Sequence, residues 1–312
     1  MSTYKEINGI KVQSLSSDPP SPFEGEVWYN STSATVKYFG VQSAAWATGG
    51  ALGTDRQQLG GAGTQTAALG FGGEPVTTAT EEYNGSAWTA GGSLAIARYG
   101  LTGCGTQTAA LAMGGYQPPI TSDSNATEEY NGSSWTTGGN LGTARRVLAG
   151  CGTQTAGLAF GGLPVQTATE EYNGTAWTGG GALTNGRYSL GGAGTQTAGL
   201  AIAGAGDPYV EEYNGTSWTA GGALPVGKQA NTGAGLQTAA LSFGGQQPEV
   251  LGTANLYDGS SWTATATMNI ARSYSGGSGT TSAALAFGGT PSGTATEEYD
   301  GGGPATLTVG TD

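Results

Sequence analysis

Small and bulky apolar residues alternate over short stretches that recur along the chain. In "TAALAMGG", Leu111 and Met113 alternate with Ala110 and Ala112. A period of two is typical of a β-strand, because successive side chains point to opposite faces. Asn-Gly or Asp-Gly pairs beside such stretches indicate tight hairpin turns. The pattern therefore predicts an all-β chain of short strands joined by turns.

These stretches belong to one repeated unit. A segment of the type "GTQTAALxFGG", once degenerate as "GTQTAGLAIAG", is followed by a variable loop, then by "TATEEYNG" or a relative, then by a Trp. The tryptophans are Trp46, Trp88, Trp135, Trp177, Trp218 and Trp262, at spacings of 42, 47, 42, 41 and 44 residues. This is the period of a four-stranded, antiparallel propeller blade. Because the first strand of each unit is richest in Gly and Ala, we expect it nearest the axis.

The charged and sulfur-containing residues of the repeat have structural interpretations. The Tyr and Trp are expected to pack, and the two adjacent Glu are expected to point one outward and one toward a basic residue of the same unit. Those basic residues are Arg98, Arg145, Arg187, Lys228 and Arg272. Cys104 and Cys151 occupy one repeat position, where other units have Ala or Ser. A small residue in a tight place is the favoured interpretation, and a disulfide or metal pair is the alternative.

Composition restricts the chemistry. The net charge is -12, so the basic patch of a nucleic-acid binder is missing. No apolar run is long enough for membrane insertion. Because the chain has no His, the Ser-His and Cys-His nucleophile systems are excluded. Adjacent Glu on a strand face opposite sides and do not converge on a substrate. We therefore expect no catalytic residue, no metal and no cofactor.

The Gly-Gly after the second strand, the Tyr in the third and the Trp opening the fourth resemble kelch-type β-propellers. The amino-acid sequence of the repeat is similar to that of kelch-like repeats in structural proteins of bacteriophages, particularly marine ones. "PPSPFEGEVWYNSTSATVKYFG", from Pro19 to Gly40, resembles a segment of phage tail and fibre proteins. The resemblance implies an attachment or assembly segment at residues 1–25 and a propeller at 26–312, with a partial blade at 26–50 and six repeats at 51–312.

Seven blades are favoured by this division. The hairpin "EVWYN"/"TVKYFG" and the following "AAW" would supply strands of a seventh blade, and "ATLTVG" at 305–310 would replace the missing final Trp strand. Six blades are the alternative, if the N-terminal strands instead complete the last repeat.

Candidate binding residues lie where the repeat varies, in the loops between second and third strands. These loops are expected on the same face as the connections between blades. The candidates are Tyr116, Asp123, Asp207, Tyr209, Gln246 and Gln247. Aromatic rings there could stack on sugars while carboxylates and amides bind hydroxyl groups. Neutral variation of the loops is the competing interpretation.

The resemblance implies a virion component, made in the host cytoplasm, that presents this loop face to a host glycan or receptor. Its expected partners are other virion proteins, bound through the N-terminal segment, and a further copy of the chain as in oligomeric appendages. The alternatives are a carbohydrate-active propeller enzyme, which requires a clustered acid pair, and a purely structural virion protein without a ligand.

Overall fold

The computed structural model describes residues 12–118 and 122–309. The chain forms two compact units, which we describe separately. Unit 1 combines residues 1–45 with residues 301–312, and unit 2 comprises residues 46–300. This division differs from the predicted boundary at residue 25, because the first described residues pair with the hairpin that follows them. Residues 1–11 of the predicted attachment segment lie outside the described residues.

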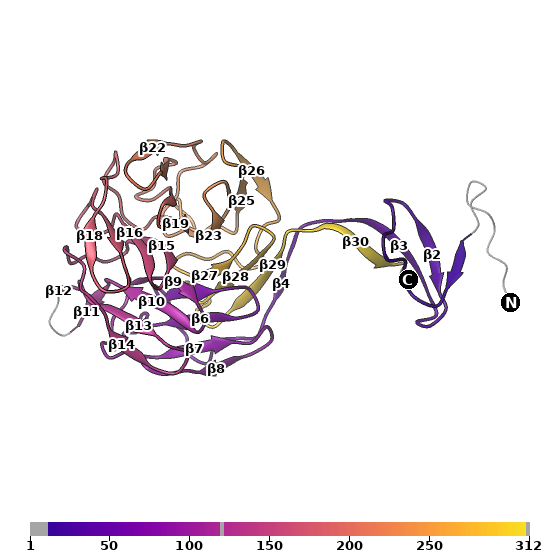
Figure 1. Cartoon of the computed structure of the whole chain (residues 1–312), viewed down its shortest axis with the longest axis horizontal. Helices are drawn as coiled ribbons and strands as arrows, with labels where there is room; N and C mark the ends of the chain where they lie inside the picture. Colours follow the sequence, from indigo (N-terminus) through magenta and orange to yellow (C-terminus); the bar gives the residue numbers. More distant parts are fainter. Residues whose placement is uncertain (1–11, 119–121, 310–312) are drawn as a thin grey trace. The chain divides into compact units, whose positions relative to one another are not determined.

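The described residues contain strands, turns and bends, and among them is no helix that could cross a membrane. The all-β prediction is confirmed. Unit 2 has a β-propeller-like arrangement of six four-stranded sheets (Figure 1). Sheets 1 to 6 are named here in chain order.

Each of the first three sheets is a continuous stretch of chain, interrupted in sheet 2 by a small hairpin. Sheet 1 contains β5 (Gly60–Gly63), β6 (Ala68–Phe71), β7 (Thr80–Tyr83) and β8 (Trp88–Ala90). Sheet 2 contains β9 (Thr102–Thr106), β10 (Ala109–Met113), β13 (Thr127–Tyr130) and β14 (Trp135–Thr137), with the hairpin β11 (Tyr116–Gln117) and β12 (Ser122–Asp123) between its middle strands. Sheet 3 contains β15 (Ala149–Thr153), β16 (Ala156–Phe160), β17 (Thr169–Tyr172) and β18 (Trp177–Gly179).

The last three sheets follow the same order, except that the final strand of sheet 6 comes from the N-terminal side. Sheet 4 contains β19 (Gly191–Thr195), β20 (Ala198–Ile202), β21 (Val210–Tyr213) and β22 (Trp218–Ala220). Sheet 5 contains β23 (Thr232–Leu236), β24 (Ala239–Phe243), β25 (Ala254–Tyr257) and β26 (Trp262–Thr265). Sheet 6 contains β27 (Gly276–Gly279), β28 (Ala283–Phe287), β29 (Thr296–Asp300) and β4 (Ala45–Thr48).

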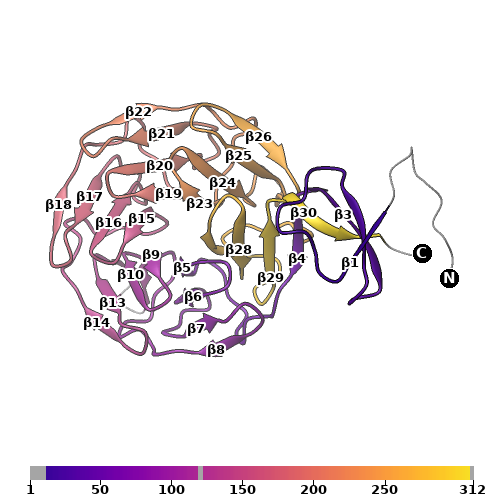
Figure 2. The same ribbon diagram turned by 45° about the vertical axis from the view of Figure 1, so that its right-hand side comes forward.

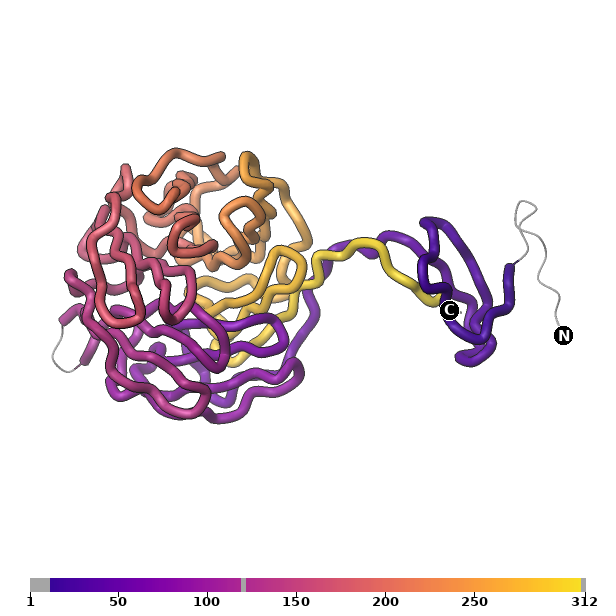
Figure 3. The backbone as a smooth tube through the Cα atoms, viewed as in Figure 1, coloured from indigo at the N-terminus to yellow at the C-terminus, as the bar shows by residue number. Residues whose placement is uncertain are grey.

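The first strands of the six sheets lie innermost, as the sequence predicts. β5, β9, β15, β19, β23 and β27 each contact the next, and β27 contacts β5 (Figure 2). The tube in Figure 3 shows the colours of unit 2 following one another around this centre in chain order. A side chain at Gly233 would place its Cβ 2.6 Å from the carbonyl oxygen of Gly192, and one at Gly61 would lie 2.7 Å from that of Gly277. Glycine at this position therefore lets neighbouring inner strands approach.

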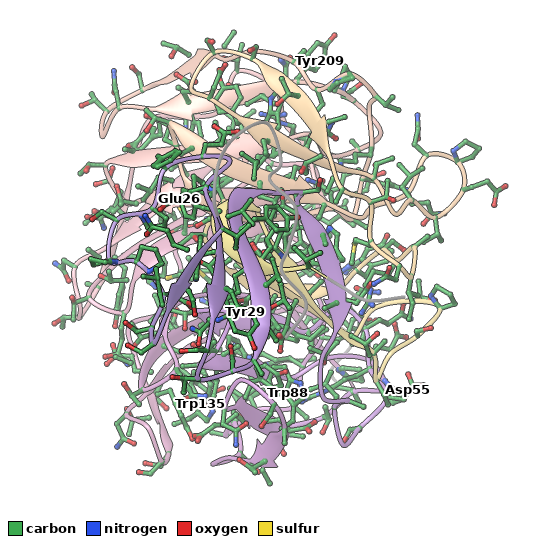
Figure 4. All side chains as sticks on the ribbon, turned by 90° about the vertical axis from the view of Figure 1, so that its right-hand side faces the viewer. Glu26, Tyr29, Asp55, Trp88, Trp135 and Tyr209 are labelled. Atoms are coloured by element: carbon green, nitrogen blue, oxygen red, sulfur yellow. The ribbon has the colours of Figure 1, made fainter. Side chains whose placement is uncertain are left out.

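Repeated hydrogen bonds join each sheet to its neighbour. At the boundary of sheets 1 and 2, Gln107 Nε2 donates to the carbonyl oxygens of Ala68 at 2.9 Å and Tyr83 at 2.6 Å. The Tyr130 hydroxyl donates to Glu82 at 2.6 Å, and Trp135 Nε1 donates to Thr80 at 2.9 Å. Figure 4 labels Trp135 and its counterpart Trp88. The Tyr and Trp of the repeat are packing residues, as expected, and they also carry these polar links.

The pairing predicted for a seventh blade is wrong. β4 carries Trp46 and is hydrogen-bonded to β29, so the N-terminal strand completes the last repeat. Trp46 packs against Phe243 and Tyr299, with ring centroids 5.3 and 5.0 Å apart. The C-terminal strand, predicted to fill this place, instead pairs with the N-terminal hairpin in unit 1. The fourth strand of sheet 6 is therefore β4 and not β30.

Unit 1 is a four-stranded sheet in the order β1 (Gln13–Leu15), β2 (Val27–Asn30), β3 (Thr35–Gln42) and β30 (Gly303–Thr308). Trp28 is buried, and its Nε1 donates to Asp18 at 3.0 Å. Lys37 also contacts Asp18, at 2.8 Å. Hydrogen bonds from Lys37, Asn30 and Trp28 lower the pKa of Asp18 to about 2. Tyr29 of the same sheet is labelled in Figure 4.

The two cysteines are free and buried. Cys104 Sγ lies 3.6 Å from the Thr153 carbonyl oxygen of the next sheet, and Cys151 Sγ lies 3.5 Å from that of Thr195. Burial raises the pKa of Cys104 to about 12. The interpretation as small residues in a tight place is confirmed.

The close approach of inner strands can be tested at one glycine. We expect Gly233→Ala to destabilise unit 2 by about 1–3 kcal/mol, because the added methyl meets a backbone carbonyl that cannot move freely. Gly179→Ala is the matched control, since nothing lies within 4 Å of a Cβ there. Urea unfolding followed by tryptophan fluorescence measures both. Equal stability of the two variants would contradict the account.

Candidate binding face

The variable loops and the connections between sheets lie at the same end of the sheets, as predicted. In sheet 2, Tyr99 of the connection forms an antiparallel bridge with Tyr116 of the loop. Equivalent bridges are Gln57–Glu74, Arg146–Leu163, Gln229–Gln246 and Ser273–Thr290. We call this end of unit 2 the loop face.

A buried arginine holds both ends of the variable loop in five of the six sheets. Arg98 Nη1 donates to the carbonyl oxygen of Gly114, before the loop, at 2.8 Å and to that of Ala126, after it, at 2.6 Å. The arginines that do this are Arg56, Arg98, Arg145, Arg187 and Arg272. Each loop therefore varies in sequence above a base whose geometry is fixed.

The first Glu of each pair holds the arginine in place. Glu128 Oε1 lies 3.1 Å from Arg98 Nη2, and both side chains are buried. The other oxygen of Glu128 accepts from the backbone N–H of Ala95 at 2.6 Å. Burial lowers the pKa of Arg98 to about 10, although the charge of Glu128 opposes this shift. The guanidinium stays protonated at neutral pH because that value is well above 7.

The second Glu differs from the sequence prediction. Glu82 is not simply directed outward but accepts the hydroxyl hydrogen of Tyr130 in the next sheet. The prediction that one Glu of the pair points toward a basic residue is confirmed for the first Glu. The prediction that the other Glu points outward is incomplete, because the second Glu also binds a tyrosine of the next sheet. Both carboxylates of the repeated pair are therefore bonded to other residues of the scaffold.

Sheet 5 departs from the pattern at several positions together. Lys228 replaces the arginine, Asn255 replaces the first Glu, and Leu256 replaces the second. Pro225, which has no N–H, stands where Ala95 donates in sheet 2. Lys228 is buried, and its Nζ has no hydrogen-bond partner among the described residues. The base of the loop of sheet 5 therefore lacks the clamp.

A cycle of six backbone hydrogen bonds surrounds the axis on the loop face. The N–H of Gly100 donates to Gln58, Val147 to Gly100, Ser189 to Val147, Ala230 to Ser189, Tyr274 to Ala230, and Gln58 to Tyr274, at 2.7–3.0 Å. All six residues have positive φ, between 45° and 64°. Only one is glycine, so the cycle holds five side chains in a conformation that L-residues avoid. Such strain is concentrated at functional sites.

A pocket of about 130 Å³ lies at the axis inside this cycle. It is lined by the starts of all six inner strands, and so it lies at the loop-face end. Leu59, Leu101, Leu148 and Leu190 of sheets 1 to 4 line it, whereas Asn231 and Ser275 occupy the same position in sheets 5 and 6. The lining residues thus differ between sheets 1 to 4 and sheets 5 and 6.

The structure brings two of the predicted residues together. Tyr116 and Asp123 pair across the hairpin β11–β12. Arg146 contacts Asp123 at 2.6 Å, and its guanidinium lies 4.9 Å from the centroid of the Tyr116 ring. Tyr99 packs on Tyr116, with centroids 5.3 Å apart. Sequence reasoning missed Tyr99 and Arg146, which lie in the segments that join consecutive sheets. Their position directly after a repeated arginine was the signal that could have identified them.

The other predicted residues lie on the loops of sheets 4 and 5. Asp207 and Tyr209 are exposed, and Tyr209, labelled in Figure 4, is 51% exposed. Gln246 pairs with Gln229, and Gln247 Nε2 lies 3.5 Å from the carbonyl oxygen of Gly206. These two loops therefore contact each other, whereas no described contact joins them to Tyr116 or Asp123.

A second cavity, of about 250 Å³, lies between sheets 1 and 6 on the loop face. Asp55 and Glu74 both line it. Glu74 Oε2 accepts from the amides of Gln57 and Gln58, each at 3.3 Å. Sequence reasoning did not single out this acid pair, because the two residues come from different segments of the repeat.

Comparison with known proteins adds no identification, since neither a family model nor a curated protein matches the sequence.

The clamp can be tested at Arg98. We expect Arg98→Met to lower the free energy of unfolding by about 3–5 kcal/mol, because it leaves Glu128 buried without a counter-ion. Arg146→Met is the control, since that side chain is 34% exposed and its ion pair with Asp123 should contribute about 0–1 kcal/mol. Urea denaturation at pH 7 measures both. Similar losses in the two variants would contradict the clamp.

Lys228 gives a prediction for pH dependence. Burial lowers its pKa from 10.5 to about 8. Between these values the unfolded chain binds the proton and the folded chain does not, so the lysine destabilises the fold increasingly as the pH falls. We expect Lys228→Met to be more stable than the wild type, with the full difference below pH 8 and almost none above pH 10.5. Urea unfolding from pH 6 to 11 tests this, and a difference independent of pH would refute it.

Proposed function

We propose that the protein is a six-bladed, kelch-like β-propeller of a bacteriophage virion whose loop face recognises a glycan or receptor on the host surface. The observation that carries the proposal is the clamp, in which a buried arginine holds both ends of a variable loop in five of the sheets. Variable loops on a uniform, rigid scaffold are typical of recognition proteins.

The composition of the loop face supports a polar, hydroxyl-rich ligand. Tyr116 and Tyr209 provide aromatic rings, and Asp123, Asp207 and Gln247 provide groups that hydrogen-bond hydroxyls. Holding these groups before the ligand arrives lowers the entropy cost of binding. The strained cycle around the axis supports the same location, since strain of this kind is retained where geometry serves function.

We assign attachment to the virion to unit 1. Its sheet combines strands from near both ends of the chain, β1 and β30, and it contains none of the variable loops of unit 2. Immunogold labelling of phage particles with an antibody to this chain tests the location. Gold on tails, fibres or capsids is the expected result, and particles without label would contradict a virion role.

Binding itself is tested on a glycan array and on host cells. We expect the wild type to bind, and we expect a variant whose loops at 116–123, 205–209 and 246–251 are replaced by the short loop of sheet 6 to bind at least about tenfold more weakly, since a loss of about 1.4 kcal/mol has that effect. Thr178→Ala, in an outer strand, is the control. Undiminished binding by the loop variant would show that the loop face is not the site.

A carbohydrate-active enzyme is the second candidate, and the cavity lined by Asp55 and Glu74 favours it. Two carboxyl groups in one cavity are the minimum for acid–base cleavage of a glycosidic bond. Asp55→Asn and Glu74→Gln should each abolish release of reducing sugar from a bound glycan if the chain is an enzyme. Absence of any release by the wild type would exclude this candidate for the glycans that the array identifies.

A further inference from the structure

One face of the sheet in unit 1 is covered by the segment that connects β1 to β2. Residues directly opposite each other on neighbouring strands point to the same face, and successive residues of a strand alternate. Trp28 of β2 lies opposite Lys37 of β3, so the two share a face. Asp18 of the connecting segment bonds to both side chains and to Asn30, the next residue on that face. Trp28 is only 1% exposed as a result. We call this side the covered face.

The opposite side of the same sheet is apolar and accessible. Val27 lies opposite Tyr38, Tyr29 lies opposite Val36, and on the other side of β3 Leu307 lies opposite Tyr38. We call this side the open face, and its apolar members are Val27, Tyr29, Val36, Tyr38, Ala305, Leu307 and Val309. Each of them is half-exposed or exposed, and Tyr29 is labelled in Figure 4. None of the positions that the described strands place on the open face holds a charged residue.

An apolar sheet face of this kind needs a second layer. Folded domains bury such a face against another sheet or a helix. Contiguous apolar surface that stays exposed on a folded unit marks an interaction site. The described part of unit 1 is a single sheet, and its connecting segment lies on the covered face. The open face is therefore the part of unit 1 that requires a partner.

We propose that the open face binds the open face of a second copy of this chain, so that the two sheets form a sandwich. In a two-fold contact the same patch lies on both partners, and an uncharged apolar patch is complementary to itself. Sheets packed face to face lie about 10 Å apart and bury both inner faces together. The proposal concerns self-association and does not depend on the proposed role in a virion.

The distribution of charge favours a second copy at this place. The chain carries a net charge of -12, but unit 1 contains three basic and five acidic residues and so contributes only -2. Unit 2 carries the remainder, and two copies repel each other through like charge of this size. Contact through the uncharged open face of unit 1 joins the least charged parts of the two chains.

The size of the face sets the expected strength of the contact. With strands about 4.8 Å apart and a rise of about 3.3 Å per residue, four strands of about six residues present a face of about 19 by 20 Å. This area is at the low end for specific protein interfaces, so we expect a reversible dimer with a dissociation constant of about 1–100 µM.

Substitutions on the two faces of one strand separate the open face from the rest of unit 1. Leu307→Glu places a charge on the open face, and Tyr38→Glu does so on a second strand. Thr306→Glu is the matched control, because Thr306 neighbours Leu307 on the edge strand β30, is exposed, and points to the other face. The indole N–H of Trp28, which donates to Asp18, gives an NMR signal that reports whether unit 1 of each variant is folded.

Sedimentation equilibrium of the full chain measures the association. Between about 1 and about 200 µM, a range that includes the expected dissociation constant, we expect the wild type to change from the 30.8 kDa monomer to a dimer. Leu307→Glu and Tyr38→Glu should each weaken the dimer about tenfold or more, because a charge is buried without a partner, whereas Thr306→Glu should leave it unchanged. Raising the salt concentration from about 0.05 to about 0.5 M should strengthen the wild-type dimer, since salt screens the repulsion between the two copies.

Several results would overturn the proposal. A wild type that stays monomeric throughout means that the open face is covered by another protein or by another segment of this chain. A trimer, or a dimer that both folded open-face variants still form, means that the two open faces do not pair. A dimer that salt dissociates is held by charge and not by the apolar face. Glycan binding that persists in any of these cases leaves the proposed function of the loop face standing.

Discussion

The ion pair between a buried arginine and the first Glu of the repeat is the interaction on which the loop face depends. A guanidinium has several donors in a fixed plane, so one side chain can bind two backbone carbonyls and a carboxylate together. In sheet 2, those carbonyls belong to Gly114 and Ala126, which begin and end the variable loop. Burying such a pair has a desolvation cost, so its recurrence is better explained by geometry than by stability alone.

In sheet 5, the residues that form the clamp in the other sheets are replaced together. The arginine, the Glu and the N–H donor are all replaced there, by Lys228, Asn255 and Pro225. The link between sheets is also altered. Leu256 offers no carboxylate to Tyr299, whose hydroxyl instead lies 2.6 Å from that of Thr265. Asn231, which stands where sheets 1 to 4 have Leu, belongs to the same sheet.

Much of the fold could be predicted because the sequence pattern within each repeat indicates the strands and turns of that repeat. The hairpin turns, the inner position of the Gly-rich strand and the placement of the loops all follow from patterns within one unit. The completion of sheet 6 could not be predicted in this way. Both Trp46 of β4 and the strand β30 are plausible outer strands in isolation, and the choice depends on packing of Trp46 against Phe243 and Tyr299.

The site was less predictable, because its residues meet only when several segments are folded together. Arg146, in the connection before sheet 3, contacts Asp123 in the loop of sheet 2, and Asp55 and Glu74 line one cavity from different segments. The exchange of Leu for Asn231 was visible in the sequence as a departure from the repeat. The axial pocket is lined by all six inner strands, so no single repeat contains it.

Amide hydrogen exchange of the unmodified protein tests the clamp most directly. The N–H of Gly114 closes the loop base of sheet 2 by donating to Ala126, and the N–H of Gly244 does the same in sheet 5 by donating to Thr253. The two bonds are 3.0 and 3.1 Å long, but only the first lies beside an arginine clamp. The account predicts slower exchange at Gly114, and at its counterparts in the other clamped sheets, than at Gly244. Equal protection at all six loop bases would contradict it.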